Sequence, residues 1–206
     1  MHPINNAVKT LVSMLDDCGI EDSPVTLMPD YDLPRCTYEH GVPVKVHFGD
    51  RSAVFVSEEP VKATTKASFM RDAPLKKSAQ RAAAAGIINA VSGFLCTIRR
   101  LHACTKEEHT PCREELKKIL SGKRIYCCGN MPDARKIAGS VVEDPKAADL
   151  ILITGDGLVS DAGEILSEYP PEKLLYLGPS TTGTASMLRS PHFCPFGRAN
   201  LQTPEE

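Results

Sequence analysis

Short apolar runs in the last third of the chain predict the strands of a parallel sheet. Residues 124–128, 150–154 and 173–177 are largely apolar, are too short for a typical helix, and lead into glycine or small hydroxylated residues. Strands buried on both faces have this continuous apolar pattern. Helical patterns at 132–138 and 159–169 lie between them. The region therefore predicts an α/β fold in which ligands bind where the strands end.

The first half of the chain has a different pattern, which predicts a smaller α+β unit. Apolar residues recur at helical spacing over 5–18, and a second, longer helical pattern covers 76–101. Residues 42–48 and 53–56 alternate as half-buried strands do, and Gly49 with Asp50 between them supplies turn chemistry. We therefore expect a hairpin between two helices.

Prolines lead to two further expectations. Three prolines in 20–36 favour extended connectors there rather than regular structure. Pro43 lies inside the first strand of the predicted hairpin and lacks a backbone N–H, so we expect that strand at the edge of its sheet.

A polar stretch at 102–113, interrupted by a proline, predicts a linker before a short charged helix at 114–120. It separates an α+β unit over 1–105 from a parallel-sheet domain over 114–206. A sheet of few strands leaves faces to cover, and we expect a homodimer.

Composition narrows the classes of function. The 206 residues carry 24 lysines and arginines against 26 acidic residues, with no basic cluster and no tryptophan, so a nucleic-acid partner is not expected. No apolar run is long enough to cross a membrane and no signal peptide is recognisable, so a cytoplasmic protein without a membrane partner is expected. The eight cysteines are then expected to be reduced thiols.

Short motifs at the strand ends carry a resemblance to a known family. The chain has Ile-Thr-Gly at 153–155, Gly-Pro-Ser-Thr at 178–181, and Ile-Asn-Ala around Asn89 in the long predicted helix. With these motifs the chain resembles the heavy-metal chelation domain family. The resemblance implies a Rossmann-like C-terminal domain preceded by an enolase-N-terminal-like domain, with a site in the crevice between them that handles a metal.

The ends of the predicted strands supply the candidate ligand-binding groups. The loop 178–184 offers backbone N–H groups and hydroxyls that can hold an anion, or else it is a strand-to-helix turn capped by Ser and Thr. Asp156 lies between two glycines, where it can approach a ligand or simply form a turn. The candidates are Asn89, Gly129, Thr154, Gly155, Asp156, Gly178, Ser180, Thr181 and Thr182.

A separate cluster is a candidate transition-metal site. His102, Cys104, His109 and Cys112 lie within eleven residues and offer nitrogen and sulfur ligands. Their spacing is more compact than that of a typical zinc site, so the alternative is a polar linker whose histidines and cysteines are incidental.

Two hypotheses about function remain open. The first is binding or chelation of a metal ion, or of a metal-containing small molecule, in the interdomain crevice. The second is a small-molecule transferase that acts on an anionic or nucleotide-like substrate held at the loop 178–184. No nucleophile or general base can be identified from the sequence, so no catalytic residue is predicted.

Overall fold

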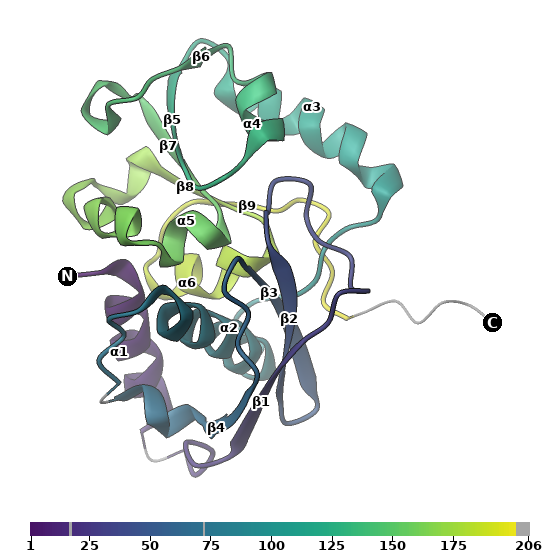
Figure 1. Cartoon of the computed structure of the whole chain (residues 1–206), viewed down its shortest axis with the longest axis vertical. Coiled ribbons are helices and arrows are strands. Elements are labelled where there is room, and N and C mark those ends of the chain that lie inside the picture. Colours follow the sequence, from purple (N-terminus) through teal and green to yellow (C-terminus); the bar gives the residue numbers. More distant parts are fainter. Residues whose placement is uncertain (17, 72, 201–206) are drawn as a thin grey trace.

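The computed structural model describes residues 1–16, 18–71 and 73–200, and it contains two β-sheets (Figure 1). The antiparallel sheet has the order β3-β2-β1-β4, and the parallel sheet has the order β6-β5-β7-β8-β9. The mixed α/β class predicted from the sequence is therefore confirmed. The strands are β1 Pro24–Pro29, β2 Val42–Phe48, β3 Arg51–Ser57, β4 Ala63–Lys66, β5 Arg124–Cys128, β6 Ser140–Val141, β7 Leu150–Ile153, β8 Leu174–Leu177 and β9 His192–Phe193.

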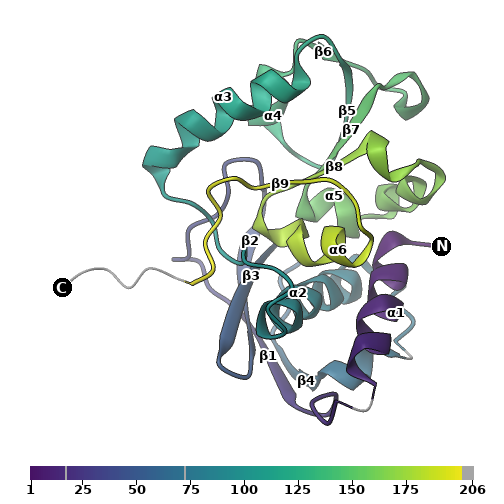
Figure 2. The same cartoon turned by 180° about the vertical axis from the view of Figure 1, so that it is seen from behind.

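A central helix joins the two sheets. Helix α2 packs against β2 and β3 of the antiparallel sheet and also against α5 and α6 beside the parallel sheet, and α1 packs against α2 and α6 (Figure 2). The α-helices are α1 Pro3–Leu15, α2 Ser78–Phe94, α3 His109–Leu120, α4 Pro132–Ile137, α5 Gly155–Val159 and α6 Thr182–Met187.

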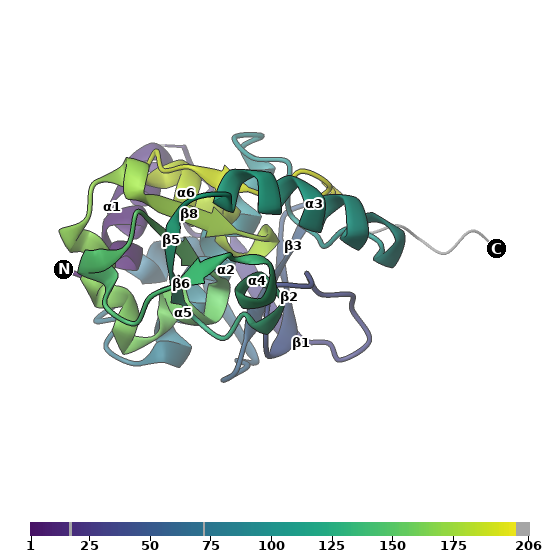
Figure 3. The same cartoon turned by 90° about the horizontal axis from the view of Figure 1, so that it is seen from above.

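The parallel strands are buried on both faces, as their apolar runs predict. Alternate side chains point to opposite faces of a strand, and Ile151 and Ile153 join one hydrophobic cluster while Leu150 and Leu152 join the other. Helices α3 and α4 contribute to the second cluster, and α5 and α6 to the first; Figure 3 shows the sheet from above with its helices. The parallel sheet is thus covered by helices on both faces.

The two predicted units, 1–105 and 114–206, share one hydrophobic cluster. It includes Leu11 and Ile88 from the first range and Ile153 and Tyr176 from the second. The C-terminal segment also returns to the end of the first range, where the backbones of His102 and Arg198 pair. The two predicted units therefore pack against each other through a shared core.

Two expectations about the antiparallel sheet were wrong. Residues 20–36 contain a strand, β1, which lies inside the sheet between β2 and β4, because Pro24 and Pro29 stand only at its two ends. The strand with Pro43, β2, is also internal rather than at the edge. The carbonyl of Pro43 accepts a hydrogen bond from the N–H of Asp30, which lies one residue beyond the end of β1. Proline is tolerated at this position because β1 has already ended where the N–H of residue 43 would be needed.

Helix boundaries also differ from the prediction. Helix α2 ends at Phe94 rather than near 101, because Cys96 adopts a left-handed φ of 57° that stops the helix. Helix α3 begins at His109 rather than 114, since a proline is tolerated in the first turn. The pattern at 159–169 forms the end of α5 and the 3-10 helix Asp161–Glu168. No described helix is long and apolar enough to cross a membrane.

Candidate functional site

The parallel sheet reverses its strand order between β5 and β7. In chain order the strands run 2-1-3-4-5, so the helices that follow β5 and β7 leave on opposite faces of the sheet. Such a point opens a crevice at the carboxyl ends of the strands, where doubly wound sheets bind ligands. The strand order places this switch point at the strand ends where the sequence predicted ligand binding.

Three predicted site residues meet at this switch point. The carboxylate of Asp156 accepts from the hydroxyl of Thr154 at 2.7 Å and from the backbone N–H of Asn130 at 2.6 Å. Gly129 has a left-handed φ of 118°, and a Cβ there would lie 3.0 Å from Asp156 Oδ2. Asp156 is half-buried, and its two hydrogen bonds join the turn after β5 to the turn after β7.

The predicted anion loop at 178–184 is buried, and the hydroxyls of Ser180, Thr181 and Thr182 have protein partners, whereas that of Thr184 has none among the described residues. Ser180 is inaccessible to solvent, and its hydroxyl oxygen accepts from the N–H of Val56 at 2.9 Å. The hydroxyl of Thr181 donates to Leu177 and Gly178, within its own turn, and that of Thr182 lies 3.0 Å from the carbonyl of Arg100. Ligand binding at this loop stays a prediction, and the contacts present join the two halves of the chain.

Asn89 supplies the central contact of that junction. Its side-chain amide donates to the carbonyls of Pro179 and Ser180, and its Oδ1 accepts from the N–H of Gly183 at 2.8 Å. The residue is fully buried. Gly155 packs on the same junction, because a Cβ there would lie 2.9 Å from Ser180 Cβ. These contacts account for Asn89 without any ligand.

Glu39 occupies the position that an anion would take at this loop. Its Oε1 accepts from the backbone N–H of Ser180 at 3.0 Å, and only 6% of the residue is exposed. Gly178, at φ 79°, leaves room for the carboxylate, since a Cβ there would lie 2.7 Å from Oε1. Its second oxygen, Oε2, has no hydrogen-bond partner among the described residues.

Burial sets the protonation of Glu39. Desolvation raises the pKa of this carboxyl to about 7, the bond from Ser180 acts in the opposite direction, and the charge of Asp156 raises the pKa further. A carboxyl with such a pKa exchanges its proton near neutral pH, which is typical of groups that act on ligands. Glu39 was not among the residues predicted from the sequence, although it lies in the run Cys-Thr-Tyr-Glu-His at 36–40, where titratable side chains are concentrated.

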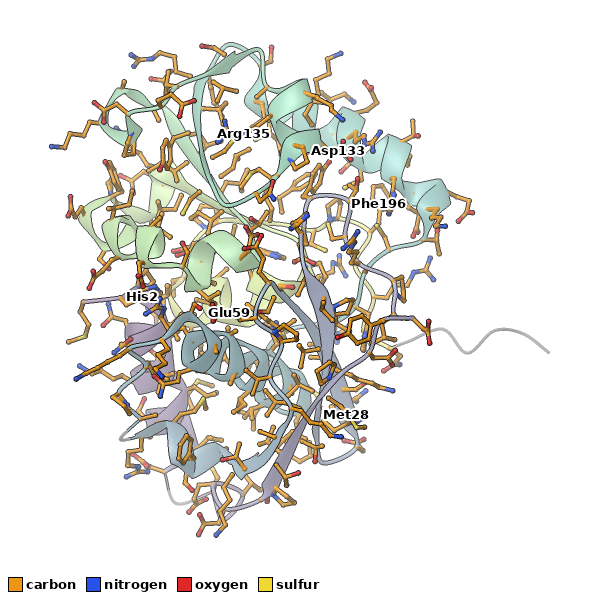
Figure 4. All side chains as sticks on the ribbon, viewed as in Figure 1. His2, Met28, Glu59, Asp133, Arg135 and Phe196 are labelled. Carbon is orange, nitrogen blue, oxygen red and sulfur yellow. The ribbon has the colours of Figure 1, made fainter. Side chains whose placement is uncertain are left out.

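Glu39 lines a cleft of about 1390 Å³. One wall is the loop 32–40, which reaches from the antiparallel sheet toward α4, where Thr37 donates to Asp133 at 2.9 Å; Figure 4 labels Asp133 on α4. The other wall is the segment that leads into α3, together with the C-terminal segment. The lining residues are Asp32, Leu33, Pro34, Arg35, Cys36, Thr37, Tyr38, Glu39, His40, His102, Ala103, Cys104, Thr105, Lys106, His109, Pro132, Arg198 and Asn200.

Three of the four predicted metal ligands line the same cleft. These are His102, Cys104 and His109, whereas Cys112 is buried on α3 in the second hydrophobic cluster. Burial raises the pKa of both cysteine thiols, to about 11 for Cys112, so neither is a thiolate at neutral pH in this arrangement. Within residues 1–16, 18–71 and 73–200, no three His, Cys, Asp or Glu side chains form a group that could hold a metal ion.

Unpartnered polar atoms are concentrated at the cleft. Eleven described side chains have a buried nitrogen or oxygen without a hydrogen-bond partner, and five of them line it. Buried polar atoms are nearly always paired, so five such atoms on residues that line one cavity indicate a place where a ligand or water completes the bonds. The five residues are Tyr38, Glu39, His102, His109 and Arg198.

The chain was compared with protein-family models, with curated proteins and with solved structures, and none of them matches it.

Proposed function

We propose that the protein binds a small polar molecule in the Glu39 cleft and that Glu39 Oε2 is a hydrogen-bond partner of that molecule. The observation that carries the proposal is this oxygen, which is buried, unpartnered among the described residues and belongs to a residue that lines the cleft. Leaving a buried polar group without a partner costs about 1–3 kcal/mol. A ligand with an N–H or O–H group recovers that cost.

The carboxyl suits a ligand that exchanges a proton. With its pKa raised to about 7 by burial, Glu39 is present in both protonation states near neutral pH. It can therefore accept a hydrogen bond from a ligand in one state and donate one in the other.

A thermal-shift panel of amino acids, organic acids, nucleotides and divalent metals tests the proposal. We expect at least one polar compound to stabilise the protein, and Glu39→Gln to weaken its binding by roughly tenfold or more, the worth of one hydrogen bond to a charged group. Glutamine keeps the size and an acceptor for the Ser180 N–H. The matched control is Glu143→Gln, whose side chain is 90% exposed. Equal affinity in both variants would refute the role of Glu39.

A metal-containing small molecule is the second candidate ligand. It is favoured by His102, Cys104 and His109, which line the cleft together with Cys36. Because the described residues provide no complete metal-coordination site, atoms of the small molecule would have to fill the remaining coordination positions. This keeps the chelation function implied by the family resemblance as a proposal.

Metal content distinguishes this candidate from the first. After incubation with transition metals under reducing conditions, we expect the wild-type protein to retain metal and Cys104→Ala to lose it, whereas Cys112→Ala, outside the cleft lining, should keep it. Full metal content in Cys104→Ala would exclude this thiol as a ligand.

A transferase acting at the loop 178–184 has less support. The loop is buried, and the Ser180 hydroxyl and the N–H groups of Ser180 and Gly183 are paired with Val56, Glu39 and Asn89, so an anionic or nucleotide-like substrate would have to displace these contacts.

The finer fold relationships are also proposals. The strand order, with its switch point, supports a Rossmann-like second half, and the hairpin followed by α2 supports an enolase-N-terminal-like first half. A homodimer and a cytoplasmic location stay predictions; light scattering on the purified protein tests the first.

A further inference from the structure

One end of the cleft is built by a pair of backbone segments from opposite ends of the chain. The N–H of His102 donates to the carbonyl of Arg198 at 2.9 Å, and the N–H of Arg198 donates back at 3.0 Å. In such an antiparallel pair the two side chains emerge on the same face, about 5.5 Å apart at Cα. His102 and Arg198 both line the cleft, so they lie side by side within it.

The unpartnered atoms at this end are nitrogens. They are Nδ1 of His102, Nε of Arg198 and Nε2 of His109, none of which has a partner in the described part of the chain. His102 is 2% exposed, and Ser52 Oγ lies 3.5 Å from its other nitrogen. Arg198 Nε carries a hydrogen in every state of the side chain. His102 Nδ1 carries one in the tautomer in which Ser52 Oγ donates to Nε2, and this is the tautomer that an anion would select.

The charges of the cleft residues favour a ligand that accepts hydrogen bonds. The charged cleft residues are the cations Arg35, Lys106 and Arg198 against the carboxyls Asp32 and Glu39. One guanidinium nitrogen of Arg198 already donates to Glu108 at 2.9 Å, which fixes the side chain and leaves Nε available. An arginine held in this way presents its remaining donors in a fixed geometry.

The geometry points to an anion subsite formed by His102, His109 and Arg198 at this end of the cleft, which would hold a carboxylate or phosphate group of the ligand. The inference rests on the proposed function and specifies its ligand as an anionic small molecule that also carries a donor for Glu39 Oε2. It locates anion recognition away from the loop 178–184, where the chain's own Glu39 takes that position.

Titration of histidine-labelled protein with inorganic phosphate, and separately with malonate, tests the subsite at constant ionic strength set with chloride. Of the six histidines, we expect saturable shifts for His102 and His109, assigned with His102→Gln and His109→Gln. Arg198→Gln should weaken phosphate or malonate binding by roughly tenfold or more, and Arg198→Lys by less, because lysine keeps the charge but loses the fork. Arg124→Gln is the matched control, since Arg124 pairs with Asp149 outside the cleft.

Each outcome decides the inference. Tighter binding of phosphate identifies a phosphate-bearing ligand, and tighter binding of malonate a carboxylate. No saturable shift with either anion, or equal affinity in Arg198→Gln and Arg124→Gln, overturns the subsite. If Arg198→Gln fails to fold, His102→Gln replaces it, with the same expected loss measured at His109. Should the panel compounds still bind in a Glu39-dependent manner when the anions do not, the subsite is wrong and the proposed function stands.

Discussion

Replacing Asn89 by alanine tests whether the contact between α2 and the loop 178–184 is structural. Asn89 is fully buried and makes three hydrogen bonds across the junction. The substitution leaves the N–H of Gly183 without its side-chain acceptor, whereas the carbonyl of Pro179 also accepts from the N–H of Thr182. We therefore expect the free energy of unfolding to fall.

The magnitude follows from the groups left unpaired. One buried N–H without a partner costs about 1–3 kcal/mol, and the weakened bonds to two carbonyls add to it, so a loss of about 2–4 kcal/mol is expected. In a protein of this size that corresponds to a decrease in Tm of roughly 5–15 °C. A loss of this size is a large part of the stability of a typical domain, about 5–15 kcal/mol.

Ser92→Ala is the matched control for this measurement. Ser92 lies on the same helix and is equally buried, but its hydroxyl has no partner among the described residues. Both substitutions end in alanine and gain similar helix propensity, so the difference between them isolates the hydrogen bonds of Asn89. Urea unfolding followed by circular dichroism gives both free energies. If Asn89→Ala loses no more stability than Ser92→Ala, the junction is not held by this residue.

Three further predictions concern the same region. Burial raises the pKa of Glu39 in the folded protein to about 7, above its value in the unfolded chain, so the folded state binds the extra proton and the free energy of unfolding falls as pH rises toward 7. Glu39→Gln should abolish this pH dependence and be more stable than wild type at pH 8, as measured by urea unfolding at several pH values. Gly178→Ala should destabilise the protein more than Gly122→Ala, since both have left-handed φ but only Gly178 faces Glu39; equal losses in thermal unfolding would refute the clash. Arg81→Ala should cost several kcal/mol because Arg81 is buried and donates to three carbonyls, whereas Asp161→Asn, at a carboxylate that is 94% exposed, should cost less than about 0.5 kcal/mol.

Local sequence patterns predicted the buried strands of the parallel sheet and the turn of the hairpin. The three runs that became β5, β7 and β8 are apolar at every position but a few, because a parallel strand between two layers of helices has no solvent-facing side. The turn at Gly49 and Asp50 was likewise predicted, since its glycine supplies the left-handed φ of 58° that the hairpin requires. The edge of the sheet proposed for ligand binding followed from these strands.

Tertiary structure decided which polar residues belong to the candidate site. Neither Asn89 nor Glu39 reveals its partners in the local sequence. Only the packing of the two halves gives Asn89 three hydrogen-bond partners and leaves Glu39 Oε2 with none among the described residues. The pairing of His102 with Arg198 joins residues 96 positions apart in the chain. No local periodicity encodes such contacts, because they depend on how whole elements pack. The sequence thus determined the strands and their burial, and the fold determined the cleft.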